Sequence, residues 1–146
     1  ESELRARATT LGIADRVFFE GQADHARVLD LMRGATVYFQ AFRTAPDGDT
    51  EGMPSSVQEA MAAGRAIVTT AHAGIPEHVF HGKTGLLSPE GDVTSIADNL
   101  ERAIGDPGLR NALGKAARAH AVEHLDYRSL YAKAEAFMKQ HWNPRP

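Results

Sequence analysis

The chain has 146 residues, about the length of one ordinary domain, and 42% of them are hydrophobic, which is enough for a real core. The formal net charge of −3 gives no electrostatic attraction to nucleic acid or to an anionic membrane. The absence of cysteine excludes disulfides and thiolate metal sites. No apolar run comes near the length of about 18 residues that a transmembrane helix needs.

In the first two thirds of the chain, short apolar runs alternate with amphipathic stretches. Runs rich in β-branched and aromatic residues predict strands. Stretches whose apolar residues recur every three or four positions predict helices, and glycine or proline marks their ends. In chain order, the predicted elements are a helix over 4–11, a strand over 17–19, a helix over 24–33, a strand over 36–39, a helix over 55–63, a strand over 66–69, a short helix at 74–77 and a strand over 86–87.

The last third of the chain is predicted to be helical. Asp92 is expected to cap a first helix, and a second should run from about Pro107 to His124. A third helix should start at Asp126. On one side, we expect it to bury Leu130, Ala134, Phe137 and Met138.

Strands that alternate with helices predict an α/β fold with a parallel sheet. In such sheets a ligand binds in the crevice at the carboxyl ends of the strands. The candidate loops are therefore those that follow Phe19, Phe39 and Thr70.

The loop that leads into the helix at 55–63 contains Glu51-Gly52-Met53-Pro54. Its glycine lets the backbone approach a ligand closely, and the helix start offers unpaired N–H groups and a positive dipole end. This arrangement suits a diphosphate, and it explains how a mildly acidic chain could bind an anion.

Glu51 and Glu59 place two carboxylates around the start of the same helix. They could accept hydrogen bonds from two sets of sugar hydroxyls. From spacing alone, the plainer interpretation is that Glu51 caps the helix and Glu59 is a solvated surface residue.

Several motifs along the chain, in this order, resemble the signature of family 4 of the retaining glycosyltransferases. The resemblance covers essentially the whole chain. Within the family, Asp47-Gly48-Asp49 and His72 resemble the exopolysaccharide branch typified by colanic-acid-type transferases. The motifs that carry the family resemblance are Leu11-Gly12, Asp15-Arg16-Val17, Glu51-Gly52-Met53-Pro54, Glu59-Ala60-Met61-Ala62-Ala63-Gly64, Gly74-Ile75-Pro76-Glu77, Gly82-Lys83-Thr84-Gly85-Leu86-Leu87 and Asp106-Pro107.

The resemblance implies a Rossmann-like parallel sheet with flanking helices, the carboxyl-terminal, donor-binding part of a GT-B enzyme. Residues 1–146 then form a single partial domain. The first strand–helix units and the acceptor-binding domain are expected to be absent. Family members draw an Arg and a Lys from that first unit, so the chain alone is expected to be inactive.

The implied activity of the full-length bacterial parent is retaining transfer of a hexose from UDP- or GDP-hexose to a glycan or lipid-linked acceptor, for surface polysaccharide. No cofactor and no metal are expected. A cytoplasmic location is implied, with peripheral contact of the parent with the inner membrane left open.

Individual site residues follow from the resemblance. Glu51 should bind hydroxyls of the donor sugar as the catalytic-site residue, and Glu59 should hold the ribose. The remaining positions should shape the sugar pocket (Gly52, Met53 and Pro54), face the diphosphate (Ser55, Ser56 and Val57) or lie near the nucleobase (Gln22, Ala23 and Asp24).

Alternative interpretations remain. The chain could be a nucleotide-binding module without catalysis, or part of a GT-B-fold nucleotide-sugar epimerase. The acids at 47–51 suggest calcium but lack the other ligands of an EF-hand loop. Gly82-Lys83-Thr84 is expected to be a turn, because the spacing to an earlier glycine does not fit a phosphate loop. His72 could touch donor or acceptor, and the other histidines are expected at the surface.

If the usual strand order of a Rossmann sheet applies, the strand at 17–19 lacks both neighbouring strands. Exposed strand edges of this kind pair with other chains. We therefore expect strand exchange or tight homo-oligomerisation. A monomer in sedimentation at micromolar concentration would contradict this expectation.

Overall fold

The computed structural model describes residues 1–48, 50 and 52–142. Two residues of the predicted site region, Asp49 and Glu51, lie outside the described residues. The chain divides into two compact units, Glu1–Asp30 and Leu31–Pro146, and each is described by itself.

The first unit holds α1 (Ser2–Thr10), the 3₁₀ helix η1 (Ala14–Arg16) and the first residues of α2 (His25–Gly34). The predicted cap of α2 is confirmed, because the Asp24 carboxylate accepts a 2.8 Å hydrogen bond from the Arg27 N–H. The strand predicted at 17–19 is wrong, since these residues form no strand pairing. A strand needs a neighbour to bond its N–H and C=O groups, and the described part of this unit offers none.

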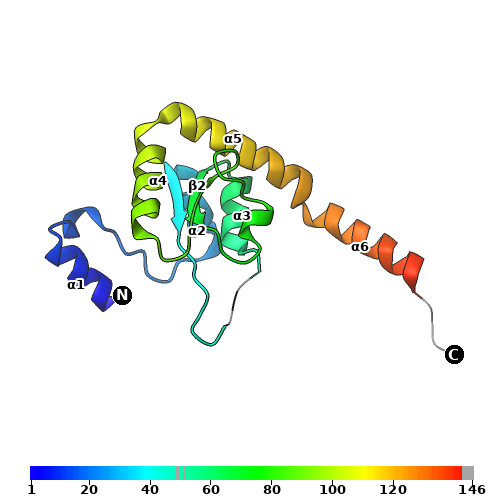
Figure 1. Ribbon diagram of the computed structural model, residues 1–146, viewed down its shortest axis with the longest axis horizontal. Coiled ribbons are helices and arrows are strands. Elements are labelled where there is room, and N and C mark those ends of the chain that lie inside the picture. The colour runs from blue at the N-terminus through cyan, green and yellow to red at the C-terminus, as the bar shows by residue number, and fades with distance from the viewer. Residues whose placement is uncertain (49, 51, 143–146) are drawn as a thin grey trace. The chain divides into compact units, whose positions relative to one another are not determined.

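The second unit contains a three-stranded sheet of β1 (Val37–Gln40), β2 (Ala66–Thr70) and β3 (Leu86–Ser88). The order is β1-β2-β3 and both pairings are parallel, which confirms the predicted fold class. Helix α3 (Ser55–Ala62) connects β1 to β2, and the 3₁₀ helix η2 (Ile75–Glu77) lies between β2 and β3 (Figure 1).

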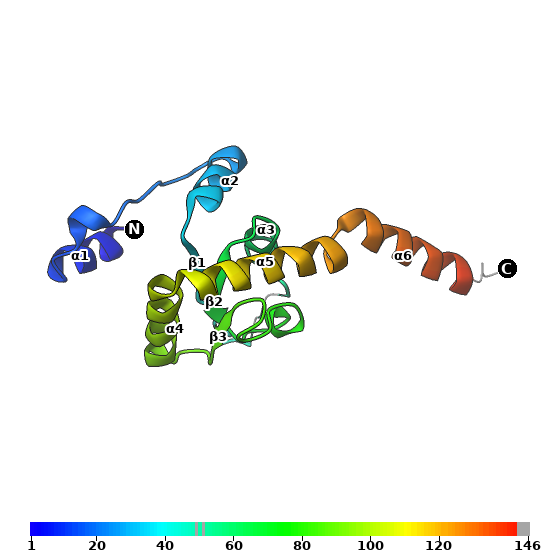
Figure 2. The ribbon, with the colours of Figure 1, turned by 90° about the horizontal axis from the view of Figure 1, so that it is seen from above.

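Two long helices cover the sheet. Helices α4 (Val93–Gly105) and α5 (Pro107–His124) lie beside the strands in Figures 1 and 2. Asp92 and Asp106 cap them by accepting hydrogen bonds from the backbone three residues on, each at 2.9 Å. The buried residues that join these helices to the sheet are Ala66, Val68, Leu86, Ala103 and Leu113.

The last helix, α6 (Tyr127–His141), leads away from the sheet (Figures 1 and 2). Its predicted existence is confirmed, but the predicted burial of one side is wrong. Leu130, Phe137 and Met138 are 46%, 63% and 57% exposed, and Ala134 is exposed as well. Periodicity decides which residues share a face of a helix, but burial needs a partner surface, and α6 has none among the described residues.

The segment before β3 is a turn, as predicted. Gly82 has φ +74°, which glycine adopts without steric cost. The Thr84 hydroxyl accepts from the Phe80 N–H at 2.7 Å and donates to the His78 carbonyl at 3.1 Å. This turn precedes β3, so it lies at the edge of the sheet opposite to the carboxyl ends of the strands.

The open sheet edge differs from the expected one. Among the described residues, β1 pairs with β2 alone, so its other side has no strand beside it. Because residues 17–19 form no strand, association through that segment loses its structural basis. The homo-oligomerisation expected from the sequence stays a prediction.

The turn that follows α3 touches α5 at two glycines, Gly64 and Gly114. A Cβ built on Gly114 would lie 2.2 Å from the carbonyl oxygen of Gly64. We expect Gly114→Ala to lower the free energy of unfolding by about 1–3 kcal/mol, because the helices must move apart. Gly105→Ala is the control, since its Cβ would meet open space. Urea unfolding followed by circular dichroism measures both, and equal effects of the two variants would contradict the packing argument.

Candidate functional site

The three parallel strands end together at Gln40, Thr70 and Ser88. The loops that follow these residues therefore meet at one edge of the sheet, where ligands bind in α/β proteins. Two of the three predicted loops, those after β1 and β2, are confirmed at this edge. The loop after β3 also joins them, and sequence reasoning missed it.

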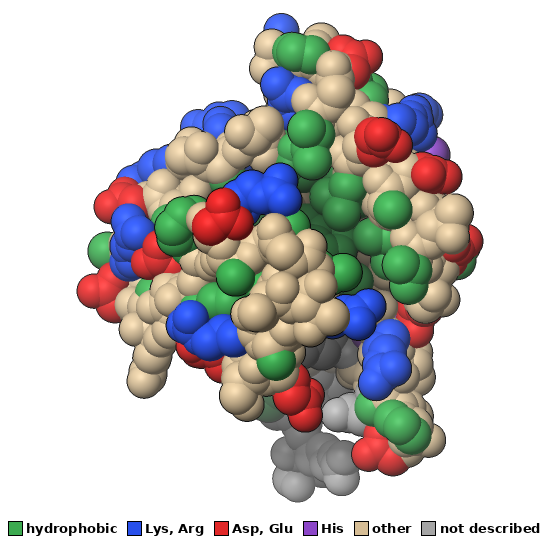
Figure 3. Space-filling model, turned by 90° about the vertical axis from the view of Figure 1, so that its left-hand side faces the viewer, with side chains coloured by type: hydrophobic (Ala, Val, Ile, Leu, Met, Phe, Trp, Pro, Cys, Tyr) green, Lys and Arg blue, Asp and Glu red, His purple; other side chains and the backbone are tan. Residues whose placement is uncertain are grey.

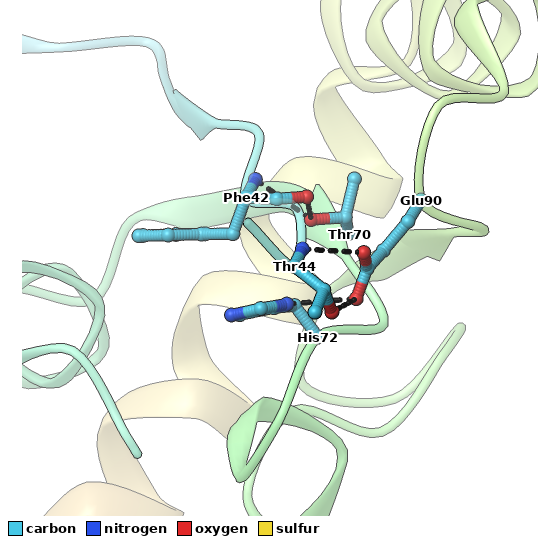
Figure 4. A network of polar contacts seen from close by, with 5 residues as sticks. All are labelled: Phe42, Thr44, Thr70, His72 and Glu90. Carbon is cyan, nitrogen blue, oxygen red and sulfur yellow. Dashed lines mark hydrogen bonds and ion pairs between the residues drawn. The ribbon is translucent and has the colours of Figure 1, made fainter. Parts of the chain in front are cut away.

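Buried hydroxyls on β2 hold the loop after β1. The Thr70 Oγ1 accepts from the Phe42 N–H at 2.8 Å and donates to the Phe42 carbonyl at 2.7 Å (Figure 4). The Thr69 hydroxyl donates to the Gln40 carbonyl at 2.7 Å. Both threonines are buried, so these bonds replace water at the backbone of the loop.

Gln40 connects β1 to the start of α3. Its side-chain oxygen accepts from the Ser56 hydroxyl at 3.0 Å and from the hydroxyl of Tyr38. Burial raises the pKa of Tyr38, the hydrogen bond with Ser56 lowers it, and the negative charge of Glu59 raises it. The charge of the Glu59 carboxylate therefore acts on the hydrogen-bonded group of Tyr38, Gln40 and Ser56.

The start of α3 is formed as the sequence predicts. Pro54 is buried, and its carbonyl accepts from the N–H groups of Val57 and Gln58 at 3.1 and 3.2 Å. Ser55 is exposed and Ser56 is half-buried. The N–H groups of Ser55 and Ser56 precede the first bonded position of the helix, so they can face a ligand.

The segment before α3 packs against the loop after β2. A Cβ on Gly74 would lie 3.4 Å from the carbonyl carbon of Gly52 and 3.5 Å from the Met53 nitrogen. Met53 is half-buried, and its carbonyl accepts a 3.0 Å hydrogen bond from the Gln58 side chain. The backbone at Gly52 and Met53 therefore lies beside Gly74, at the distance of ordinary van der Waals contact for an added Cβ.

Further along α3, Val57 and Glu59 have different surroundings. The Val57 side chain is fully buried, so only its backbone could face a diphosphate. Glu59 is half-buried and lines a groove of about 540 Å³. The other residues of this groove come from α3 and from the junction of α5 and α6: Gln58, Ala62, Ala121, Val122, Leu125, Asp126 and Tyr127.

His72 turns inward. Its side chain is 2% exposed, its Nδ1 lies 2.7 Å from Glu90 Oε1, and its ring stacks on Phe42 with the centroids 6.0 Å apart. The neighbouring Ala73 has φ +44°, a left-handed conformation that is uncommon for a residue with a Cβ. From the sequence, His72 could touch donor or acceptor. In the structure its buried side chain instead contacts Glu90 and Phe42.

The remaining predicted residues lie elsewhere. Gln22, Ala23 and Asp24 belong to the first unit, and their place near a nucleobase stays a prediction. Glu51 lies outside the described residues, so its role with the donor sugar also stays a prediction.

Two histidines that were expected at the surface are half-buried. His78 Nδ1 lies 3.2 Å from His120 Nε2, and His124 lies beside His120 with ring centroids 4.5 Å apart. Burial lowers the pKa of His120, and the neighbouring His124 and His78 lower it further. This group ties the segment after η2 to α5.

Charge is evenly mixed on the face drawn in Figure 3, where positive and negative side chains alternate without a large patch of either sign. Among the described residues, no three acidic or histidine side chains converge in a geometry that could hold a metal ion. In the same part of the chain, every helix is too short or too polar to cross a bilayer.

Comparison with known proteins identifies the family. The family model described as "Glycosyl transferases group 1" matches residues 1–120. The chain belongs to this family. It is 37% identical over 118 residues to the amylovoran biosynthesis glycosyltransferase AmsK of Erwinia amylovora, which covers 78% of the chain and 28% of AmsK. It is also 37% identical over 100 residues to WcaL of Salmonella typhimurium, named as a candidate colanic acid biosynthesis glycosyltransferase, covering 68% of the chain and 25% of WcaL.

Among solved structures, HepE from Anabaena in complex with UDP-glucose superimposes with a TM-score of 0.82 at 25% identity. The match covers 95% of this chain and 36% of HepE. The chain thus spans 28% and 25% of the length of AmsK and WcaL, and about a third of HepE. These matches confirm the resemblance found in the sequence, including the exopolysaccharide branch, and the GT-B-type fold.

Thr70 is the buried group on which the loop after β1 depends. We expect Thr70→Val, which has nearly the same shape, to lower the free energy of unfolding by about 1–3 kcal/mol, because it leaves two backbone groups of Phe42 without their partner. The exposed Thr94→Val on α4 is the matched control, with an expected change within about 0.5 kcal/mol. Chemical denaturation measures both variants. A Thr70→Val chain as stable as wild type would show that the hydroxyl is dispensable.

Proposed function

We propose that this chain is the donor-binding, carboxyl-terminal part of a retaining hexosyltransferase that uses UDP- or GDP-hexose. The observation that carries the proposal is the backbone arrangement at the carboxyl edge of the sheet. There, Gly52 and Met53 pack on Gly74, and the first turn of α3 follows directly.

The start of α3 suits the diphosphate of a nucleotide sugar. When the bond between sugar and phosphate breaks, negative charge develops on the leaving diphosphate and the sugar gains oxocarbenium character. Fixed N–H groups at a helix start stabilise such charge without reorganisation. The backbone N–H groups of Ser55 and Ser56 would supply these donors, with Ser55 the more exposed of the two.

The carboxylates would hold the two sugars of the donor. Glu59 would accept hydrogen bonds from the ribose hydroxyls, and its position in an open groove leaves it accessible to a ligand. Glu51 would bind the hydroxyls of the transferred hexose, and Gly52, Met53 and Pro54 would shape that pocket. Gln22, Ala23 and Asp24 would lie near the base.

The comparisons support a nucleotide-sugar donor and a polysaccharide product. HepE, whose structure covers almost the whole chain, was solved with UDP-glucose. AmsK and WcaL carry names of polysaccharide biosynthesis enzymes. Retention of configuration and independence from a metal are properties of the retaining family that the motifs resemble.

The complete activity belongs to the whole protein. We propose that a glycan or lipid-linked acceptor binds to a further domain and that the product is bacterial surface polysaccharide. The reaction would take place on the cytoplasmic side, with the acceptor bringing the protein to the inner membrane.

Isothermal titration of the chain with UDP, GDP and ADP tests the donor site. We expect one nucleotide to bind, and Glu59→Ala to weaken its binding by about 10- to 100-fold, the effect of losing a hydrogen bond to a charged group. Glu101→Ala is the matched control, because Glu101 is an exposed carboxylate on α4.

The outcomes separate two explanations of a failure. If the chain binds none of the three nucleotides but the longest natural polypeptide that contains it does, further segments complete the site. If neither binds, the donor assignment is wrong. An equal loss in Glu59→Ala and Glu101→Ala would remove Glu59 from the site.

A further inference from the structure

Glu90 joins loops that are far apart in the sequence. Its Oε2 accepts a 2.7 Å hydrogen bond from the backbone N–H of Thr44, which lies 46 residues earlier in the chain. Its Oε1 lies 3.4 Å from the Thr44 hydroxyl (Figure 4). The loop after β3 therefore holds the loop after β1 through one carboxylate.

The same carboxylate also bonds to the loop after β2. His72 Nδ1 lies 2.7 Å from Glu90 Oε1. The imidazole is 2% exposed and stacks on Phe42 at an interplanar angle of 10°, whereas the Glu90 side chain is 31% exposed. Glu90 thus lies at the rim of the edge, while the groups it holds are inside.

The charge state of Glu90 fits this role. The hydrogen bond from the Thr44 backbone lowers the pKa of Glu90, and the hydrogen bond from His72 lowers it further. The carboxylate is therefore ionised at neutral pH, and hydrogen bonds to an ionised acceptor are stronger than neutral ones.

These contacts hold the loop between β1 and α3 at both ends. At its beginning, Phe42 is bonded to Thr70 and Thr44 is bonded to Glu90. Near its end, Gly52 packs on Gly74, which follows His72 by two positions. Both ends of the long loop between β1 and α3 are thus tied to the network.

We propose that Glu90 is a positioning residue for the donor segment from Gly52 to Ser56, an inference that rests on the function proposed above. Without its carboxylate, Thr44 and His72 lose their shared partner, and the loop must be ordered when the nucleotide binds. Ordering side chains and loops on binding costs affinity. Glu90 itself touches no ligand in this role.

The chain offers a matched control two residues away. Asp92 lies in the same loop, is exposed, and caps α4 by accepting from the Ser95 N–H at 2.9 Å. Its loss weakens a helix but breaks no bond to the described residues of the loops after β1 and β2. Comparing Glu90→Ala with Asp92→Ala therefore separates positioning from general stability.

Two measurements test the proposal in the whole chain. In titrations with UDP, GDP and ADP, we expect Glu90→Ala to lower the affinity for the nucleotide that binds by about 3- to 10-fold, because the loop is then ordered only on binding. In hydrogen exchange followed by NMR, the Thr44 amide should exchange about tenfold faster or more, because its acceptor is gone. Asp92→Ala should change neither quantity.

A conservative variant provides a rescue. Glu90→Gln keeps one oxygen that can accept from the Thr44 N–H, and its amide group can donate to the other tautomer of His72. We expect it to restore most of the Thr44 protection and of the nucleotide affinity.

Three results would overturn the inference. The first is wild-type affinity in Glu90→Ala beside normal binding by the wild-type chain, which would leave the proposed function intact. The second is an equal loss of affinity in Asp92→Ala. The third is the absence of nucleotide binding by both the wild-type chain and its longest natural polypeptide, which would overturn the proposed function and this inference with it.

Discussion

Burial of β2 is the constraint on which the rest of this structure depends. All five residues of this strand, from Ala66 to Thr70, are buried. A parallel strand that is buried in this way needs a neighbour on each side and a helix layer over its face. The strands β1 and β3 supply the neighbours, and α4 and α5 pack on one face through Leu113 and Ala103.

Because the strands are parallel, the same constraint creates the candidate site. Three carboxyl ends meet at one edge, and the backbone that leaves each strand must find hydrogen-bond partners there. Thr69, Thr70 and His72 are buried polar residues at this edge, and each has a bonded partner. Among the described residues, no buried side-chain nitrogen or oxygen lacks a hydrogen bond. The edge is therefore a fully bonded network, and such networks hold backbone in one arrangement.

The network also explains how an acidic chain could present an anion site. The groups proposed to bind an anion are backbone N–H groups at the start of α3. Their value to a ligand depends on their geometry, since a helix start stabilises negative charge only within its first turn. The packing of Gly52 against Gly74 therefore matters for the direction in which those N–H groups point.

Helix α6 and the residue after it expose large apolar side chains. Tyr131 on α6 is 72% exposed, and Trp142, which follows the helix, is 75% exposed. The chain spans only about a quarter of the length of AmsK and WcaL.

The sequence by itself determined the elements with strong local signals. Asp92 and Pro107 marked helix starts, Gly82 marked a turn, and β-branched runs marked β1 and β2. The ordered motifs that include Gly52 and Glu59 indicated the family. These properties could be predicted because they depend on residues close together in the chain.

Only the tertiary structure decided which long-range partners those elements meet. It left 17–19 without strand pairing and α6 without burial, because both depend on surfaces that local pattern does not contain. It also brought Glu90 to Thr44 and His72, three polar residues whose separations along the chain carry no periodic signal. Contacts of this kind arise from the parallel order of the strands, which gathers distant loops at one edge after the core has formed.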